Sequence, residues 1–132
     1  MVALSIRQPW AWLIVNGHKR LENRNWPTRQ RGPILIHAAK TMTRADYNGA
    51  AMLAEADGVT LPPFEALERG GIVGQAEIVD CINYSTSHWF FGPYAFVLEN
   101  ARPLPFRPVP GKLGFFVPKY HPHHGNMGGT HE

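Results

Sequence analysis

The 132-residue sequence has little cysteine, few charged residues and no long apolar run. Its single cysteine, Cys81, excludes an intramolecular disulfide and suits the reducing cytoplasm, where we expect the protein to be. No segment approaches the roughly 18–20 apolar residues of a membrane span, and the first residues lack a signal-peptide pattern, so no membrane partner is expected. Charged residues make up 17% of the chain beside 13 glycines and 12 prolines, which favours short strands joined by turns.

The length indicates one domain, which we place at residues 1–120. Residues 121–132 are rich in His and Gly and carry too little apolar surface to fold, so they are predicted to be a disordered tail. The apolar pattern predicts strands at 3–7, 19–24, 34–38, 72–81, 94–98, 102–106 and 113–117. The segment 102–106 lies between prolines and is expected at a sheet edge.

Helices are expected at three places. Pro9 suits the first turn of a helix over residues 10–15, which is apolar on every side and should be buried, Trp10 and Trp12 included. Thr43 can cap a helix that ends near residue 56, and residues 64–68 allow one helical turn. The chain is therefore predicted to be an α+β fold, a small mixed β-barrel with a buried N-terminal helix and one or two further short helices.

The charges are distributed unevenly along the chain. Residues 1–44 hold eight Lys and Arg against Glu22 alone, a net charge of +7, and the remainder carries five against nine acids, a net charge of −4. A basic segment of this kind indicates a polyanionic partner, and the alternative is a chance distribution over a solvated surface.

Three charged residues of the basic segment are closely spaced. Glu22 and Arg24 are two residues apart on a predicted strand and so face the same side, and Lys19 lies in the turn before them. A carboxylate between two cations should remain ionised and accept hydrogen bonds from a ligand, and Arg24 could contact a phosphate through two bonds. The alternative is an ordinary exposed ion pair between Glu22 and Arg24.

The pattern Gly17-x-Lys19-x-x-Glu22-x-Arg24 resembles a known family signature. It is similar to the G-x-K-x-x-E-x-R signature of the activating signal cointegrator homology (ASCH) domain family, and all four positions are kept. The resemblance covers roughly residues 3–118 and includes the segments 4–11, 31–38, 71–81 and 93–98.

The resemblance implies a fold like that of the PUA domain, with a cleft that binds RNA, DNA or a modified base. It places binding residues at Lys19, Glu22 and Arg24, with Arg7, Gln8 and His37 as neighbours. Together with the charge pattern, the candidate binding residues are Arg7, Gln8, Lys19, Glu22, Arg24, Trp26, Arg29, Arg31, His37 and Lys40. For His37 the alternative is a hydrogen-bonded core histidine.

Aromatic residues supply possible stacking surfaces for bases. Trp26 lies beside several arginines, and the loop at 84–93 carries Trp89, Phe90 and Phe91. Each stacked base would contribute about 1–3 kcal/mol to binding. The alternatives are a hydrophobic lid for Trp26 and core packing for the loop aromatics.

The leading interpretation is a nucleic-acid-binding module, with RNA favoured over DNA and a modified nucleoside also considered. An alternative implied by the resemblance is a hydrolase, a ribonuclease or an N4-acetylcytidine amidohydrolase, with Lys19 and Glu22 as catalytic residues. The amidohydrolase type has a threonine where this chain has Glu22. A third alternative is a protein-interaction domain. No metal and no cofactor is expected, because the histidine spacing in 121–132 matches no zinc site.

Overall fold

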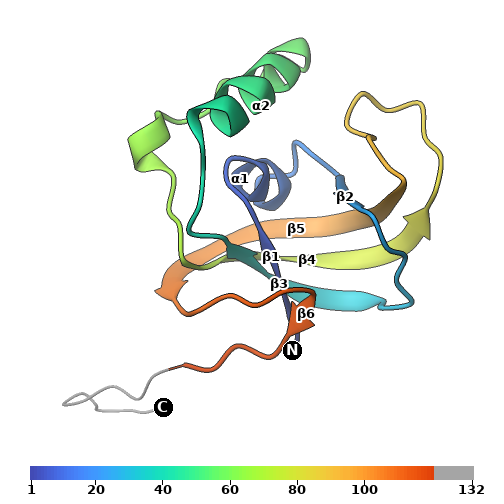
Figure 1. The fold of residues 1–132 in the computed structure, drawn as a ribbon, viewed down its shortest axis with the longest axis vertical. Helices are drawn as coiled ribbons and strands as arrows, with labels where there is room; N and C mark the ends of the chain where they lie inside the picture. The colour runs from blue at the N-terminus through green and yellow to red at the C-terminus, as the bar shows by residue number, and fades with distance from the viewer. Residues whose placement is uncertain (121–132) are drawn as a thin grey trace.

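A computed structural model describes residues 1–120 and shows one mixed sheet with two helices above it (Figure 1). The elements are β1 (Ala3–Ile6), α1 (Trp10–Val15), β2 (Leu21–Arg24), β3 (Gly32–Ala38), α2 (Arg44–Ala56), the short 3₁₀ turn η1 (Phe64–Ala66), β4 (Gly71–Ile82), β5 (Tyr94–Pro108) and β6 (Phe115–Phe116). The prediction for residues 121–132 lies outside the described residues.

The sheet is curled into a half-barrel, which confirms the predicted α+β barrel-like fold. The strand order is β2-β5-β4-β3-β1-β6, with β1 and β3 parallel and the other pairs antiparallel. Within residues 1–120 the end strands β2 and β6 do not pair with each other. The two sides are linked instead by the side chain of Arg24 on β2, whose Nη2 donates to the carbonyl oxygen of Ser5 on β1 at 2.9 Å.

The strand β5 differs from the prediction because it runs unbroken where two strands were expected, whereas β4 lies where the sequence predicts a strand. The pairing of β4 with β5 shifts register at three places, and such bulges let long strands coil into a barrel wall without ending. Only the first part of β5, from Tyr94 to Val97, also pairs with β2. The proline-rich second part has an open side, which confirms its predicted edge position.

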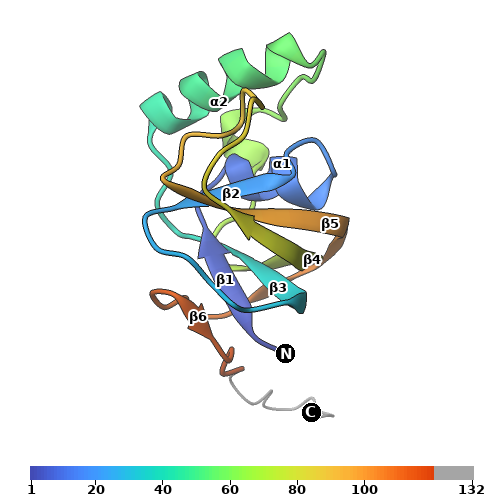
Figure 2. The ribbon, with the colours of Figure 1, turned by 90° about the vertical axis from the view of Figure 1, so that its right-hand side faces the viewer.

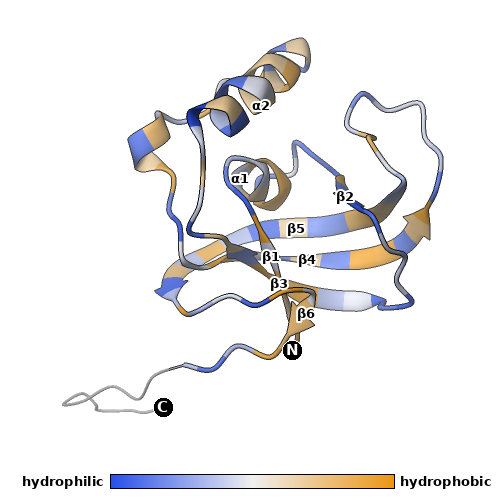
Figure 3. Ribbon diagram, viewed as in Figure 1, coloured by the Kyte–Doolittle hydropathy of each residue, from blue (hydrophilic) through white to orange (hydrophobic). Residues whose placement is uncertain are grey.

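The helix α1 lies between the sheet and α2, as Figures 1 and 2 both show. Its residues Ala11, Ile14 and Val15 belong to the core above the sheet, and Leu13 packs with Ala50 and Ala54 of α2. The hydropathy colouring in Figure 3 accordingly marks α1 as hydrophobic and α2 as mixed. The prediction of a buried helix is confirmed.

The tryptophans of α1 differ from the prediction, since Trp10 and Trp12 are only half-buried. The helix is held so close to the sheet on its other side that a Cβ at Gly74 of β4 would lie 2.4 Å from Val15 Cγ1. Trp10 packs partly against both the core above the sheet and the core that α1 shares with α2, and Trp12 packs against the latter. No helix in the described part of the chain is long and apolar enough to cross a membrane.

The helix α2 starts where the sequence indicates. Thr43 is the N-cap, its hydroxyl accepting a bond from the backbone N–H of Asp46 at 2.9 Å. The Asp46 carboxylate in turn accepts from the backbone N–H of Thr43, which completes a capping box. The same carboxylate pairs with Arg7, which borders the site described next.

Candidate functional site

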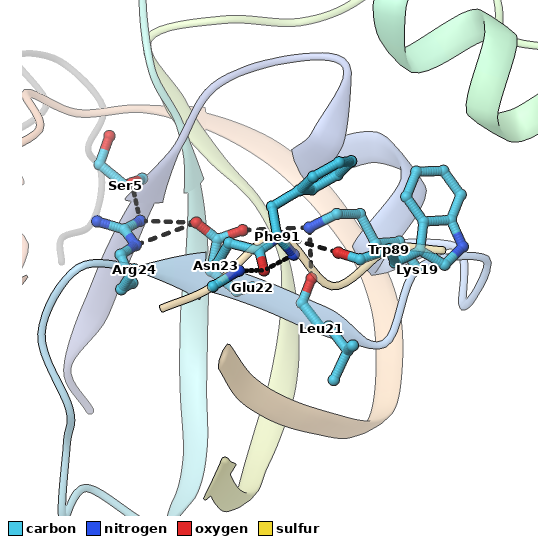
Figure 4. Close-up of polar contacts among 9 residues, drawn as sticks. Ser5, Lys19, Leu21, Glu22, Asn23, Arg24, Trp89 and Phe91 are labelled. Atoms are coloured by element: carbon cyan, nitrogen blue, oxygen red, sulfur yellow. Dashed lines mark hydrogen bonds and ion pairs between the residues drawn. The ribbon is translucent and has the colours of Figure 1, made fainter. Parts of the chain in front are cut away.

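Lys19, Glu22 and Arg24 form a continuous chain of polar contacts along β2 (Figure 4). The Lys19 ammonium donates to the carbonyl oxygen of Leu21 and lies 3.4 Å from Glu22 Oε1. The other carboxylate oxygen, Oε2, accepts from Arg24 Nε at 3.1 Å and lies 3.0 Å from Arg24 Nη2. The expectation that Lys19 and Arg24 flank the carboxylate is therefore realised in the structure.

The ion pairs are inside the protein rather than on its surface, because Lys19 is 3% exposed and Glu22 is 8% exposed. Burial lowers the pKa of Lys19 below its ordinary value. The adjacent Glu22 carboxylate acts in the opposite direction through its charge and its hydrogen bond, and Arg24 lowers the pKa further. The alternative of an ordinary exposed ion pair does not describe this arrangement.

A cleft of about 670 Å³ opens over these residues. Its floor holds Lys19, Glu22 and Arg24, and its walls come from five separate parts of the chain. The lining residues are Ser5, Ile6, Arg7, Trp10, Lys19, Glu22, Asn23, Arg24, Asn25, Trp26, Gly49, Leu53 and Phe91. The cleft thus combines buried charges with aromatic and aliphatic walls.

The loop at residues 84–93, here called the aromatic loop, reaches the cleft because Asn23 of β2 holds it. The Asn23 side chain accepts from the backbone N–H groups of Phe91 and Gly92, at 2.8 and 3.1 Å, and donates to the carbonyl oxygen of Trp89 at 2.9 Å (Figure 4). Phe91 lines the cleft with 65% of its surface exposed. Trp89 is instead 4% exposed, and its indole N–H donates to Asp57.

The role of Asn23 was not predicted from the sequence. Asn23 lies between Glu22 and Arg24 on β2, and its hydrogen bonds join segments 66 to 69 positions apart in the sequence, which no local pattern indicates. Trp26 packs edge-on against Phe96 and Phe115, with ring centroids 5.3 and 5.7 Å away, and also lines the cleft. This packing agrees with the interpretation of Trp26 as a hydrophobic lid, and its role as a stacking surface for a base stays a prediction.

Arg7 is at the rim of the cleft, in an ion pair with Asp46 at 3.0 Å. Burial acts to raise the pKa of Asp46, but hydrogen bonds from Thr43 and Arg7 and the charge of Arg7 lower it below its ordinary value. Arg29 and Arg31 do not line this cleft; Arg31 lies near Asp80, with 3.8 Å between Nη2 and Oδ1.

Gln8 is buried beside α1 and does not line the cleft. Its side chain accepts from the backbone N–H of Trp12 and donates to the carbonyl oxygen of Glu68, so it braces the helix against the segment before β4. His37 and Lys40 line a neighbouring cleft. Within residues 1–120, no three His, Cys, Asp or Glu side chains gather in a way that could hold a metal ion.

The cleft offers specific hydrogen-bonding groups to a ligand. An ionised carboxylate can accept about four hydrogen bonds, and the Glu22 group receives three contacts from its two cations. The longest of these, 3.4 Å, is at Oε1, which leaves this oxygen able to accept an N–H from a ligand. Arg24 keeps Nη1 without a partner among residues 1–120.

Comparison with known proteins agrees with the signature. The chain matches the ASCH domain family model over residues 4–112. It is 26% identical over 113 residues to activating signal cointegrator 1 of Homo sapiens, covering 76% of this chain and 19% of that protein. It is 31% identical over 84 residues to activating signal cointegrator 1 of Mus musculus, covering 61% of this chain and 14% of that protein. The chain thus spans less than a fifth of the length of these relatives, and it belongs to the ASCH domain family.

Proposed function

We propose that this domain binds nucleic acid by capturing one base of an RNA, or of another single-stranded nucleic acid, in the cleft over Lys19, Glu22 and Arg24. The observation that carries the proposal is the composition of the cleft. Phe91 supplies an exposed aromatic surface next to a buried carboxylate with a free acceptor position. Base recognition in single strands uses this combination of a stacking surface and hydrogen bonds to the base edge.

The charges of the cleft suit the same ligand. Glu22 is matched by Lys19 and Arg24, so the carboxylate does not repel a polyanion as an unpaired acid would. The carboxylate selects for a base edge that presents an N–H group, such as an exocyclic amine. Arg7 at the rim is the cation placed to meet the backbone of the strand.

Phe91→Ala tests the stacking wall, with Tyr84→Ala as the matched control. Both aromatic rings are exposed, at 65% and 74%, but Tyr84 lines another hollow. Because a stacked base contributes about 1–3 kcal/mol, Phe91→Ala should weaken binding of a labelled single-stranded oligonucleotide by roughly 5- to 150-fold in fluorescence anisotropy. Tyr84→Ala should leave the affinity unchanged.

A salt titration tests the phosphate contacts with the unmodified protein. The apparent affinity should fall with added salt, with a slope of about −0.7 in log–log form for each phosphate neutralised on a single strand. An affinity that does not change with salt, or equal losses for Phe91→Ala and Tyr84→Ala, would contradict the proposal.

A second candidate function is hydrolysis, because a buried lysine with a lowered pKa beside a carboxylate is a common arrangement in active sites. It is tested by incubating the protein with labelled RNA and with N4-acetylcytidine. Turnover that Lys19→Met abolishes would favour the hydrolase, and binding without turnover would favour the binding module.

A further inference from the structure

A second cleft of about 560 Å³ adjoins the first. The two share Ser5, Arg7 and Arg24, so these residues form the ridge between them. The remaining walls of the second cleft come from the end of β3, the segment before β4 and the loop between β5 and β6. These residues are His37, Ala39, Lys40, Gly70, Val109, Pro110, Gly111, Lys112, Leu113 and Gly114.

The second cleft differs chemically from the first. Its lining includes four permanent cations, Arg7, Arg24, Lys40 and Lys112, and neither a carboxylate nor a Phe, Tyr or Trp ring. Lys40 and Lys112 are exposed and form no ion pair within residues 1–120. A wall of cations and glycine backbone without aromatic surface suits a phosphate group rather than a base.

The loop that carries Lys112 is anchored firmly to the sheet. His37 Nε2 donates to the carbonyl oxygen of Val109 at 2.8 Å, since a carbonyl can only accept. His37 Nδ1 lies 2.9 Å from the hydroxyl of Ser5. Gly111 packs against the same ring so closely that a Cβ there would be 2.6 Å from its Cε1. The backbone next to Lys112 is therefore held near β1 by contacts with the His37 ring, and not only by its connections within the loop.

We propose that the second cleft is a phosphate subsite, which holds the phosphate joined to the nucleoside whose base occupies the first cleft. Arg7 and Arg24 on the shared ridge would lie between base and phosphate, with Lys40 and Lys112 on the far side. The inference rests on the proposed function and makes it more specific. The ligand class is a nucleotide or a phosphodiester strand, and a free nucleoside fills only half of the site.

Amide chemical-shift titrations with four classes of ligand test this proposal. The probes are the common nucleosides, their 5′-monophosphates, their 3′-monophosphates and a mixed-sequence pentaribonucleotide. Nucleosides should shift amides that line the first cleft, around residues 22–26 and 91, but not those of residues 111–114. The phosphorylated ligands should also shift the amides of residues 111–114. A preference for one monophosphate would identify a terminal phosphate in the subsite, and tight binding of the pentaribonucleotide alone would identify an internal phosphodiester.

The double variant Lys40→Gln with Lys112→Gln tests the two lysines. Each lysine that no longer pairs with the phosphate should lower the affinity for phosphorylated ligands by up to about five-fold. The affinity for nucleosides should not change. The slope of log affinity against log salt for the pentaribonucleotide should become shallower by about 0.7. The matched control, Arg102→Gln with Lys119→Gln, removes two exposed cations that line neither cleft and should preserve the phosphate preference.

The outcomes separate the two proposals. If ligands bind and Phe91→Ala lowers their affinity, but the lysine variant and its control have the same affinity for phosphorylated ligands, the phosphate subsite is wrong and the proposed function stands. The phosphate subsite is also wrong, and the proposed function stands, if nucleosides and their monophosphates bind with equal affinity. If neither nucleosides nor the pentaribonucleotide bind, both proposals are wrong.

Discussion

Replacing Glu22 by glutamine should strongly destabilise the domain. The substitution keeps the shape of the side chain but removes the charge that lies 3.4 Å from Lys19 Nζ and 3.0 Å from Arg24 Nη2. Lys19 is 3% exposed, so its ammonium group would remain buried without a counter-charge. Removing one partner of a buried pair costs about 3 kcal/mol or more, which is a large part of the roughly 5–15 kcal/mol that stabilises a typical domain.

The loss should depend on pH because it acts through Lys19. The pKa of Lys19 is already lowered by burial, and loss of the Glu22 charge lowers it further. At pH values below the pKa of Lys19 in the folded variant, the lysine is charged in both the folded and the unfolded chain. The free-energy cost of burying its charge then destabilises the folded state in full. Between that pKa and about 10.4 the unfolded chain binds more protons, so stability increases with pH. The difference between the native protein and Glu22→Gln should therefore decrease as the pH rises from neutral towards 10.

Urea unfolding at pH 7 and pH 9.5 measures this prediction. Asp80→Asn is the matched control, since its carboxylate is exposed and 3.8 Å from Arg31, and it should change stability by less than about 0.5 kcal/mol. Adding Lys19→Met to Glu22→Gln should restore most of the lost stability, because it removes the buried charge. A loss of stability that is equal for Glu22→Gln and Asp80→Asn, or that is independent of pH, would refute the reasoning.

Two further substitutions test the loops that border the clefts. Asn23→Ala removes three hydrogen bonds to the aromatic loop and should cost about 2 kcal/mol, with faster hydrogen exchange of the loop amides at residues 91 and 92. Unchanged exchange would show that packing alone holds the loop. Gly111→Ala should cost about 1–3 kcal/mol in thermal unfolding, because the added methyl overlaps the His37 ring. Gly49→Ala, a helical position with no neighbour within 4 Å of an added Cβ, should be stabilising by up to about 1 kcal/mol, and a similar response of both glycines would contradict this explanation.

Local chemistry was sufficient to predict much of the fold. The N-cap at Thr43, the helix at the apolar segment 10–15 and the apolar strands appear where the sequence indicates. These features depend on neighbours in sequence, such as a hydroxyl within reach of the third N–H of a helix. The unbroken β5 was not predicted, because a bulge lets a strand continue through a pattern that otherwise looks like a break.

The candidate site was predictable in part for the same reason. Glu22 and Arg24 share a face because alternate strand residues always do, and Lys19 is three residues from Glu22. The charge pattern could not separate the cations that line the clefts from Arg29 and Arg31. The net charge of a segment does not indicate in which direction each of its side chains points.

The sequence by itself determined which groups are present for a site: a carboxylate between two cations, a basic first third, and aromatic residues at Trp26 and in the loop 84–93. The tertiary structure decided which of them meet. Curling of the sheet brings Ser5 to Arg24. Three hydrogen bonds between the Asn23 side chain and the backbone of residues 89, 91 and 92 hold Phe91 at the cleft, 68 positions further along the chain. Such contacts arise from the packing of the whole sheet and its helices around one core. The same packing buries Lys19 and Glu22, so that their charges interact with each other and with Arg24 away from water.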